Sequence, residues 1–273
     1  MATQSERAKA FHALHHQDGA FVIPNPWDAG SARLLAAAGF KALATTSAGF
    51  AFTMGRRDGA VSRAEKLQHI RDLAAAVDLP LAADLENGFG AAPETVAETI
   101  RLGAEAGLVG GSIEDSSGDP AHPIYDFNHA VERVAAAVEA ARKLPFPFTL
   151  TARAENLLHG RNDLGDTIKR LQAYERAGAD VLFAPGLADL DMIKTVTSSL
   201  TRPVNVLITL PLSKLTITEL AAAGAKRISL GAGLSRAAFG AVMRAAREIT
   251  GHGSFTFLTD AMPGAEIIAV MKP

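Results

Sequence analysis

The sequence contains no cysteine in its 273 residues. Disulfides, zinc–thiolate sites and catalysis by a thiol are therefore excluded. An excess of basic residues is also missing, because 27 Lys and Arg residues balance 29 Asp and Glu residues and the net charge is −2. Without that excess we expect neither nucleic acid nor an anionic membrane as a partner.

Long apolar runs are missing as well, although hydrophobic residues make up 48% of the chain. The longest runs fall far short of the ~18 residues that a membrane-spanning helix needs. Residues 1–17 carry charges and three histidines and lack the apolar centre of a signal peptide. We therefore expect a cytoplasmic protein with a large hydrophobic core.

What the chain does contain is a repeated unit, in which a short apolar run and a polar loop precede an alanine-rich amphipathic stretch. Continuous apolar runs are typical of parallel strands covered on both faces, and eight such units favour a (β/α)₈ TIM-type barrel over an open sheet. The predicted strands are Ala20–Pro24, Ala42–Thr45, Leu81–Asp84, Val109–Glu114, Phe148–Ala152, Val181–Ala184, Val204–Ile208 and Ile228–Gly231. The predicted helices are Ser31–Ala38, Arg63–Val77, Glu94–Ala106, Asn128–Arg142, Leu164–Ala177, Leu190–Leu200, Ile217–Ala223 and Ser235–Ile249.

We expect a single barrel domain, with an N-terminal arm (1–19), a barrel (20–250) and a C-terminal tail (251–273). The tail follows the glycine-containing break Gly251-His252-Gly253. It is too apolar to stay in solvent and must cover either its own barrel or a partner's, and composition leaves both options open. Its apolar residues are Phe255, Phe257, Leu258, Ile267, Ile268, Val270 and Met271.

Acidic side chains follow several predicted strands, where a barrel of this kind carries its catalytic groups. They would repel one another at one barrel mouth, and a divalent cation would hold them together. Oxygen ligands without cysteine favour Mg²⁺, with Mn²⁺ as the alternative. A purely structural acidic cluster is the competing interpretation. The residues are Asp84, Glu86, Glu114, Asp115 and Glu155.

Other polar residues near the predicted strand ends allow two interpretations each. Arg153 pairs with a carboxylate or binds an anionic ligand. Ser47 and Gly49 are turn residues or offer backbone N–H groups to an anion. Asp58, in a long basic loop, is by itself a solvated turn residue, and Trp27 is a core aromatic or the wall of a pocket. Five histidines in helical or terminal segments are expected at the surface: His12, His15, His16, His69 and His252.

Five motifs occur in order, and with them the sequence resembles the isocitrate lyase/phosphoenolpyruvate mutase superfamily over roughly Phe21 to Ala246. They are Asn25-x-Trp27-Asp28-Ala29, Thr46-Ser47-x-Gly49, Asp84-x-Glu86-x-Gly88-Phe89-Gly90, Ser112-Ile113-Glu114-Asp115 and Ala152-Arg153-x-Glu155. The resemblance implies Mg²⁺-dependent cleavage or formation of C–C or P–C bonds in α-oxo carboxylates through an enolate-like intermediate.

The resemblance also implies roles for individual residues. Asp84 is similar to the direct metal ligand, and Glu86 and Glu114 to groups that hold metal-bound waters. The implied catalytic residues are Asp58, near the metal, Arg153, which neutralises the substrate oxyanion, and Ser47. The implied substrate-binding residues are Trp27, Ser47, Gly49, Arg153 and Asn205.

Departures from the superfamily narrow the expected activity. The chain lacks the catalytic cysteine of isocitrate and methylisocitrate lyases, and Ser116 replaces a lysine of the phosphonate enzymes. We therefore expect a lyase or decarboxylase that acts on a small 2-oxo or 2-hydroxy di- or tricarboxylate and releases pyruvate or a related 2-oxo acid. The alternatives are a P–C bond enzyme (mutase or hydrolase) and a catalytically silent carboxylate-binding barrel.

Two expectations concern moving and exchanged parts. The loop from Ser116 to Ile124 offers little apolar area for anchoring and is expected to be a mobile lid. The resemblance further implies a homo-oligomer, a dimer or more specifically a tetramer, whose C-terminal helix is exchanged between subunits.

Overall fold

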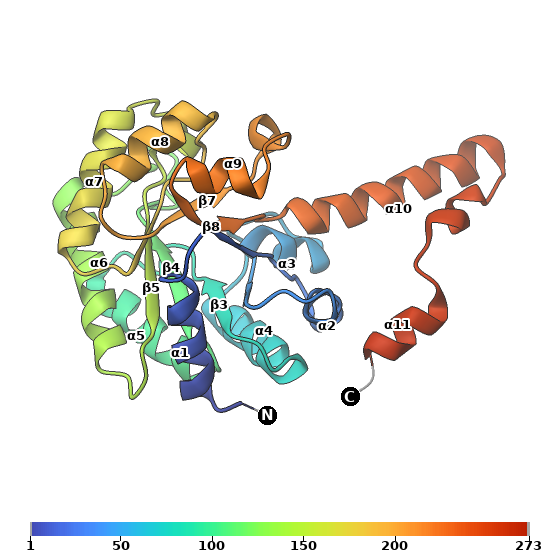
Figure 1. Ribbon diagram of the computed structural model, residues 1–273, viewed down its shortest axis with the longest axis horizontal. Coiled ribbons are helices and arrows are strands. Elements are labelled where there is room, and N and C mark those ends of the chain that lie inside the picture. The colour runs from blue at the N-terminus through green and yellow to red at the C-terminus, as the bar shows by residue number, and fades with distance from the viewer. Residues whose placement is uncertain (1, 272–273) are drawn as a thin grey trace.

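Eight parallel strands form one sheet and alternate with helices along the chain (Figure 1). The structure is a computed structural model that describes residues 2–271, so residues 1, 272 and 273 of the predicted arm and tail lie outside it. The strands are β1 (Phe21–Ile23), β2 (Leu43–Ala44), β3 (Leu81–Asp84), β4 (Gly110–Glu114), β5 (Thr149–Arg153), β6 (Val181–Phe183), β7 (Val204–Leu207) and β8 (Ala225–Ser229).

The sheet curves into a nearly closed barrel. Its strand order is β1-β8-β7-β6-β5-β4-β3-β2. The two ends of this series meet where the backbone N–H of Ala44 donates to the carbonyl of Pro24 at 3.1 Å. The predicted (β/α)₈ barrel is therefore confirmed.

The helices occupy most of the predicted positions. They are α1 (Gln4–Leu14), α2 (Ala29–Ala37), α3 (Ser47–Thr53), α4 (Arg63–Ala76), α5 (Pro93–Glu105), α6 (Phe127–Arg142), α7 (Leu164–Arg176), α8 (Leu190–Ser198), α9 (Ile217–Ala222), α10 (Gly233–His252) and α11 (Gly264–Met271). Short 3₁₀ helices are η1 (Asn156–His159), η2 (Leu210–Leu212) and η3 (Thr256–Asp260). Glycines with positive φ follow α2, α5, α7 and α9, as expected of residues that end a helix: Gly39, Gly107, Gly178 and Gly224.

Helix α1 closes the amino-terminal end of the barrel. Its Ala8 and Phe11 are completely buried and pack in one cluster with Phe21 of β1 and Ala82 of β3. A capping box between Thr3 and Glu6 begins the helix. The predicted N-terminal arm is therefore the floor of the barrel.

Three sequence-based expectations are wrong. Strand β8 begins at Ala225 instead of Ile228, so it contains the charged residues Lys226 and Arg227. The segment after β2 forms the short helix α3, which Thr46 caps by accepting from the N–H of Gly49 at 3.2 Å. His15 and His69, expected at the surface, are 3% and 4% exposed.

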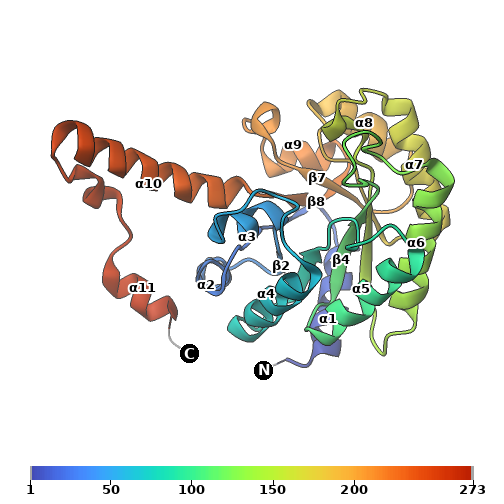
Figure 2. The ribbon, with the colours of Figure 1, turned by 180° about the vertical axis from the view of Figure 1, so that it is seen from behind.

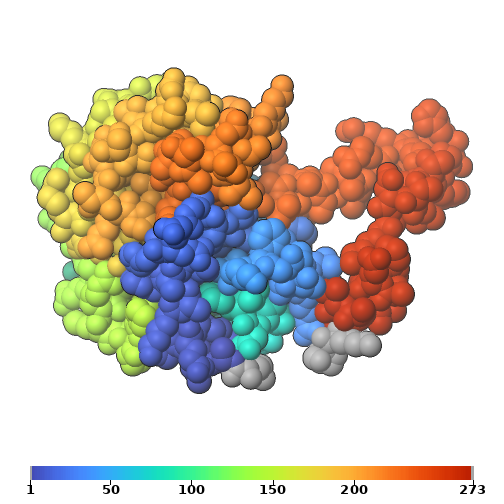
Figure 3. Space-filling model, in the orientation of Figure 1, coloured from blue at the N-terminus to red at the C-terminus, as the bar shows by residue number. Residues whose placement is uncertain are grey.

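Beyond the barrel, α10 projects outward and the chain returns through η3 to α11 (Figures 1 and 2). The carbonyl of Met271 in α11 accepts a hydrogen bond from Nη1 of Arg33 in α2 at 2.8 Å. The outer part of this arm lies apart from the barrel (Figure 3). Its exposed apolar residues are Phe239, Val242, Met243, Ile249, Phe255, Leu258, Met262, Ile267 and Ile268.

The predicted glycine break lies slightly later than expected, because α10 includes Gly251 and ends at His252, before Gly253 with its φ of 65°. In the single chain of this structure, α11 covers part of α2. Exchange of α10 or α11 between subunits therefore stays a prediction. Between residues 2 and 271, none of the helices combines the length and the apolarity that crossing a membrane would require.

Candidate active site

A cavity of about 200 Å³ lies inside the barrel at the carboxyl ends of its strands. Every strand contributes to its wall. The contributing residues include Ile23, Ala44, Asp84, Gly111, Thr151, Arg153, Phe183, Asn205 and Arg227. Pockets for drug-sized ligands have volumes of about 300–1,000 Å³, so this smaller cavity suits a small molecule.

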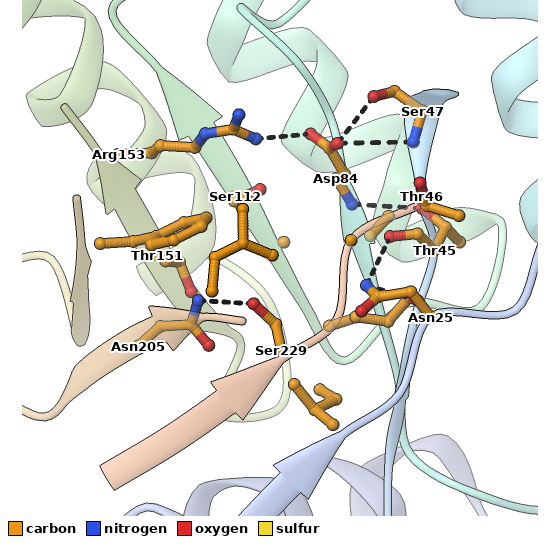
Figure 4. Close-up of a pocket in the computed structure, with 18 of the residues that line it drawn as sticks. Asn25, Thr45, Thr46, Ser47, Asp84, Ser112, Thr151, Arg153, Asn205 and Ser229 are labelled. Atoms are coloured by element: carbon orange, nitrogen blue, oxygen red, sulfur yellow. Dashed lines mark hydrogen bonds and ion pairs between the residues drawn. The ribbon is translucent and has the colours of Figure 1, made fainter. Parts of the chain in front are cut away.

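One end of the cavity gathers carboxylates around a single arginine, and we call it the acidic end: Asp84, Glu114, Arg153 and Glu155 (Figure 4 shows Asp84 and Arg153). Nη1 of Arg153 lies 3.6 Å from Oδ1 of Asp84 and 3.2 Å from Oε2 of Glu114. Its Nε pairs with Oε1 of Glu155. All four side chains are at least four-fifths buried, so water screens their charges weakly.

Carboxylates outnumber the cations at the acidic end, and their pKa values reflect this imbalance. Burial raises the pKa of Glu114 well above its usual value, although Arg153 opposes the rise, and burial also raises the pKa of Glu155. Burial and the neighbouring Asp84 raise the pKa of Glu86 to about 7. Burial alone would raise the pKa of Asp84, but Arg153, Lys66 and Ser47 hold it below its usual value.

Asp84 is fixed by its neighbours at the end of β3. Its Oδ2 accepts from Oγ of Ser47 at 2.9 Å, and its backbone N–H donates to Oγ1 of Thr45 at 3.2 Å (Figure 4). Its Oδ1 accepts from the backbone N–H of Glu86 at 3.2 Å. One carboxylate thus ties the end of β3 to the segment that follows β2.

Glu86 has a strained backbone, with φ of 53°. A non-glycine residue in this left-handed region costs about 1–3 kcal/mol, and such strain concentrates at functional sites. Arg133 of α6 stabilises the loop that follows, because its guanidinium donates to the carbonyls of Asn87, Gly90 and Ala91. The loop is therefore held in the shape that places the Glu86 side chain.

Asp115, predicted among the clustered carboxylates, has a supporting position instead. Its Oδ2 accepts from the hydroxyl of Tyr174 at 2.7 Å and from Nη1 of Arg170 at 3.1 Å. Its Oδ1 accepts from the backbone N–H of Glu155 at 2.8 Å. Asp115 thereby holds the segment that carries Glu155.

Only some of the other predicted site residues line the cavity. Ser47, Asp58 and Asn205 line the cavity, and Asp58 is exposed. Gly49 does not line it, and its N–H is occupied by Thr46. Trp27 is also outside the wall, and its carbonyl is 3.0 Å from Nε2 of His69. Glu86 and Glu114 lie behind the residues that form the wall.

The loop from Ser116 to Ile124 folds on itself. Ser116 and Ile124 form an antiparallel bridge, and the N–H of Ser117 donates to the carbonyl of Pro123 at 2.9 Å. Oγ of Ser116 is 3.1 Å from Nε2 of His159. None of the loop's residues is among those that line the cavity in the described chain.

The sequence analysis did not identify two buried basic residues. Lys66 of α4 is 1% exposed, and its Nζ has no hydrogen-bond partner among residues 2–271, while its charge interacts with Asp84, Glu86 and Asp58. Its spacing from the buried Ile70 and Leu73 on the same helix was a signal of burial. Arg227 of β8 lines the cavity and was missed because the strand was predicted to begin after it.

The acidic end has the donor chemistry of a magnesium site. Oε1 of Glu86 is buried without a hydrogen-bond partner in the described chain, and carboxylate oxygens are the ligands that Mg²⁺ prefers. Within residues 2–271, no three Asp, Glu or His side chains are grouped closely enough to hold a metal ion alone. Mg²⁺ commonly uses one or two protein carboxylates and completes its shell with water, so the residues present fit it.

A (β/α)₈ barrel with charged groups at the carboxyl ends of its strands has the arrangement of a barrel enzyme. The particular family follows from the sequence: the family model for phosphoenolpyruvate phosphomutase matches residues 11–250. The chain therefore belongs to this family, within the isocitrate lyase/phosphoenolpyruvate mutase superfamily, and the resemblance found from the motifs is confirmed.

Individual relatives agree with this assignment. The crystal structure of a candidate lyase/mutase from Burkholderia cenocepacia J2315 is 62% identical, has a TM-score of 0.96 and covers 97% of this chain and 96% of its own. The 2-methylisocitrate lyase of Escherichia coli K12 is 31% identical over 72% of this chain and 68% of its own. A 2,3-dimethylmalate lyase is 25% identical, with a TM-score of 0.86 over 100% and 96% of the two chains.

A phosphonopyruvate hydrolase crystallised with oxalate and Mg²⁺ is similar in fold alone, at 24% identity and a TM-score of 0.85 over 97% and 94% of the two chains. The superfamily thus includes lyases and mutases that act on small acids, and the chain is an enzyme with lyase-type activity. Its Mg²⁺ requirement, its reaction and its substrate are matters for proposal.

Proposed function

We propose that the protein is a Mg²⁺-dependent lyase or decarboxylase that cleaves a C–C bond in a small 2-oxo or 2-hydroxy di- or tricarboxylate. The product would be pyruvate or a related 2-oxo acid. The observation that carries the proposal is the acidic end, where Arg153 pairs with Asp84 and Glu114 at the wall of a small cavity that Asp84 and Arg153 line.

The acidic end suits a cation together with an anionic substrate. Asp84 would bind Mg²⁺ directly, with Glu86 and Glu114 around it, and Mn²⁺ is the alternative. The bound ion supplies Lewis-acid stabilisation for the charge of a developing enolate. The raised pKa values of Glu86 and Glu114 support this assignment, because burial and the neighbouring carboxylates disfavour their charged forms and a bound divalent cation would favour them.

The substrate would be positioned by groups around the same end. Arg153 carries a positive charge that would neutralise the oxyanion, and the opposing carboxylates hold it in place. Ser47 and Gly49 would offer donors to the substrate carboxylate, which requires them to exchange their present partners, Asp84 and Thr46. Asn205 faces the same cavity. Asp58 at the rim is the remaining proposed catalytic group, and Trp27 would approach substrate only after a rearrangement of α3.

Specific observations support two alternative functions. The family's name, phosphoenolpyruvate phosphomutase, favours P–C bond chemistry. A catalytically silent carboxylate-binding barrel is favoured by the loop from Ser116 to Ile124, in which Ser116 replaces the lysine of the phosphonate enzymes. The absence of cysteine supports an activity different from that of methylisocitrate lyase, and this difference stays a prediction.

The central test is release of a 2-oxo acid from a panel of oxaloacetate, substituted malates and phosphonopyruvate, with and without Mg²⁺. We expect Mg²⁺-dependent release of pyruvate or a homologue from a carbon acid. Release only from phosphonopyruvate would select P–C chemistry, and binding without release would select the silent barrel.

Calorimetry with Asp84→Ala tests the metal assignment. We expect the variant to lose Mg²⁺ binding and to keep its fold. Asp72→Ala, which removes an exposed carboxylate from α4, is the matched control and should bind Mg²⁺ normally. Unchanged affinity in Asp84→Ala would overturn the assignment.

The loop from Ser116 to Ile124 is the proposed lid. It is rich in hydrogen bonds within itself, and its residues Asp119 and His122 are exposed, which suits a unit that moves as one piece. Limited proteolysis with and without Mg²⁺ plus oxalate tests this proposal. We expect protection of the loop in the complex, and equal cleavage would contradict a lid.

We also propose a cytoplasmic homo-oligomer, a dimer or tetramer, in which the C-terminal helical arm covers a second copy. The exposed apolar residues of the arm beyond Gly251 support it, since Phe255, Leu258 and Ile268 are 61%, 62% and 66% exposed. Light scattering should show an oligomer for the full chain and a smaller species for a chain that ends at Gly251. A monomeric full chain would rule out this proposal.

A further inference from the structure

The inner end of the cavity contains a buried arginine without a carboxylate. Arg227 lines the cavity and is 6% exposed. Its guanidinium donates from Nε to Oδ1 of Asn205 at 2.8 Å, from Nη2 to Oγ1 of Thr151 at 2.9 Å and from Nη1 to Nε2 of His15 at 3.3 Å. In the part of the chain that the structure describes, no Asp or Glu pairs with it.

All three partners of Arg227 are neutral. His15 makes a 2.9 Å hydrogen bond from Nδ1 to the carbonyl of Phe11, which must be a donation from the ring and leaves Nε2 as the acceptor for Arg227. Burial and the charge of Arg227 lower the pKa of His15 to about 3, so the ring is uncharged at neutral pH. The positive charge of Arg227 is therefore uncompensated.

An uncompensated charge in a protein interior is costly, and buried arginines are normally paired with an acid or a ligand. Burial lowers the pKa of Arg227 only to about 9, so the guanidinium keeps its charge at neutral pH. A guanidinium has five N–H groups, and the three recorded hydrogen bonds leave one on each terminal nitrogen. A carboxylate can accept hydrogen bonds from two such donors.

The cavity has two ends of opposite character. In Figure 4, Ser47, Asp84 and Arg153 lie at one end, while Thr151, Asn205 and Ser229 lie at the other. Nδ2 of Asn205 donates to Oγ of Ser229 at 2.9 Å, so the side chains around Arg227 form one connected network. A ligand that spans the cavity would meet Arg227 at the end remote from Asp84.

We propose that Arg227 binds a second carboxylate of the substrate, so that the enzyme selects diacids whose 2-oxo or 2-hydroxy acid group lies at the acidic end. Asn205, Thr151 and His15 hold the guanidinium in the required orientation. The proposal rests on the proposed function, because the acidic end supplies the position of the other carboxylate.

Matched ligand pairs test the selection by calorimetry in the presence of Mg²⁺. Malate is compared with 2-hydroxybutyrate, and 2-hydroxyglutarate with 2-hydroxypentanoate, since each pair differs by a methyl group in place of the second carboxylate. We expect the wild-type protein to bind at least one diacid about 100-fold more tightly than its monoacid, which corresponds to about 2.7 kcal/mol. Oxalate, which is too short to span both ends, serves as the reference ligand.

Three variants locate the effect. Arg227→Met should remove the preference for the diacid and leave oxalate affinity within about threefold. Lys226→Met is the matched control, since Lys226 lies on the same strand and its Nζ donates to the carbonyls of Gln17 and Gly19 outside the cavity. Asn205→Asp supplies an internal carboxylate to Arg227, so it should raise the melting temperature and weaken diacid binding without loss of fold.

The outcomes separate this proposal from the proposed function. Failure of the wild-type protein to bind oxalate in an Mg²⁺-dependent manner would contradict the proposed function. Normal oxalate binding with no preference for either diacid, or a preference that Arg227→Met and Asn205→Asp both retain, would overturn the role of Arg227. If Arg227→Met fails to fold, Asn205→Asp alone decides.

Discussion

Each end of the cavity contains a buried arginine, but the charges around the two arginines differ. At the acidic end, one arginine, Arg153, serves three carboxylates, and at the inner end another, Arg227, has neutral partners only. Both arginines are buried on barrel strands at the wall of one cavity. The first end therefore lacks positive charge and the second lacks negative charge, which is the pattern that a cation and an anionic ligand would complete together.

Removal of each arginine should expose this contrast most strongly. Arg153→Met leaves buried carboxylates without their counter-charge and should lower the free energy of unfolding by about 3–5 kcal/mol at pH 8 in the absence of Mg²⁺. Arg227→Met removes an uncompensated charge and leaves hydrogen-bonding groups without a donor, so it should cost less, about 1–3 kcal/mol. Urea denaturation of both variants measures the difference.

Lys143→Met, which breaks an exposed ion pair with Glu139, is the control for these variants and should change stability by less than about 1 kcal/mol. Saturating Mg²⁺ should restore part of the stability of Arg153→Met, because the cation replaces the lost charge. Equal losses for Arg153→Met and Arg227→Met would show that the two ends do not differ in charge balance.

The next largest difference between the two ends should be in the pH dependence of Mg²⁺ affinity. Because the pKa of Glu86 is raised to about 7, this group carries a proton at pH 6, and Mg²⁺ must displace that proton on binding. The affinity should therefore rise by about fivefold from pH 6 to pH 7 and less steeply above. Calorimetry at several pH values, in buffers with different ionisation enthalpies, counts the released protons.

Glu86→Gln should bind Mg²⁺ more weakly, and the slope of its log affinity against pH between pH 6 and pH 7 should fall by about 0.7. Arg227→Met should keep the wild-type slope, since it lies at the other end. An unchanged slope in Glu86→Gln would assign the proton to another group.

Replacement of Lys66 should have the smallest effect of these changes, and its effect on Mg²⁺ affinity tests the charge balance of the acidic end. Burial lowers the pKa of the Lys66 amine, while Asp84 and Glu86 oppose this shift, and a protonated amine at this position would repel a divalent cation. Lys66→Met keeps an unbranched side chain that is one atom shorter and removes the amine, so Mg²⁺ affinity should rise by about tenfold or less, which is the effect of a charge interaction on the order of 1 kcal/mol. Weaker Mg²⁺ binding in this variant would mean that the amine helps to build the site.

The sequence analysis named Asp84, Glu114 and Arg153 of the acidic end and Asn205 of the inner end, but it missed Arg227, for a physical reason. Asp84, Glu114 and Arg153 directly follow or end continuous apolar runs, so their position at the barrel mouth could be inferred from the strand pattern. Arg227 lies inside a strand whose first residues are Ala225, Lys226 and Arg227. That pattern does not look buried, because the outward Lys226 and the inward Arg227 are both charged.

Local sequence also could not show contacts between distant segments. The burial of His15 depends on such a contact, since His15 meets Arg227 across 212 positions of sequence. The eight repeated units, in contrast, are local patterns, and they were sufficient to predict the barrel.

The floor formed by α1 has a consequence for how this enzyme can diverge. His15 follows a helix that precedes the first strand, yet it holds the guanidinium that faces the cavity. A change in this leading segment can therefore alter ligand choice while every strand and loop of the barrel stays the same. Evolution, or protein engineering, can change the specificity of the barrel from its floor, away from the acidic end at its mouth.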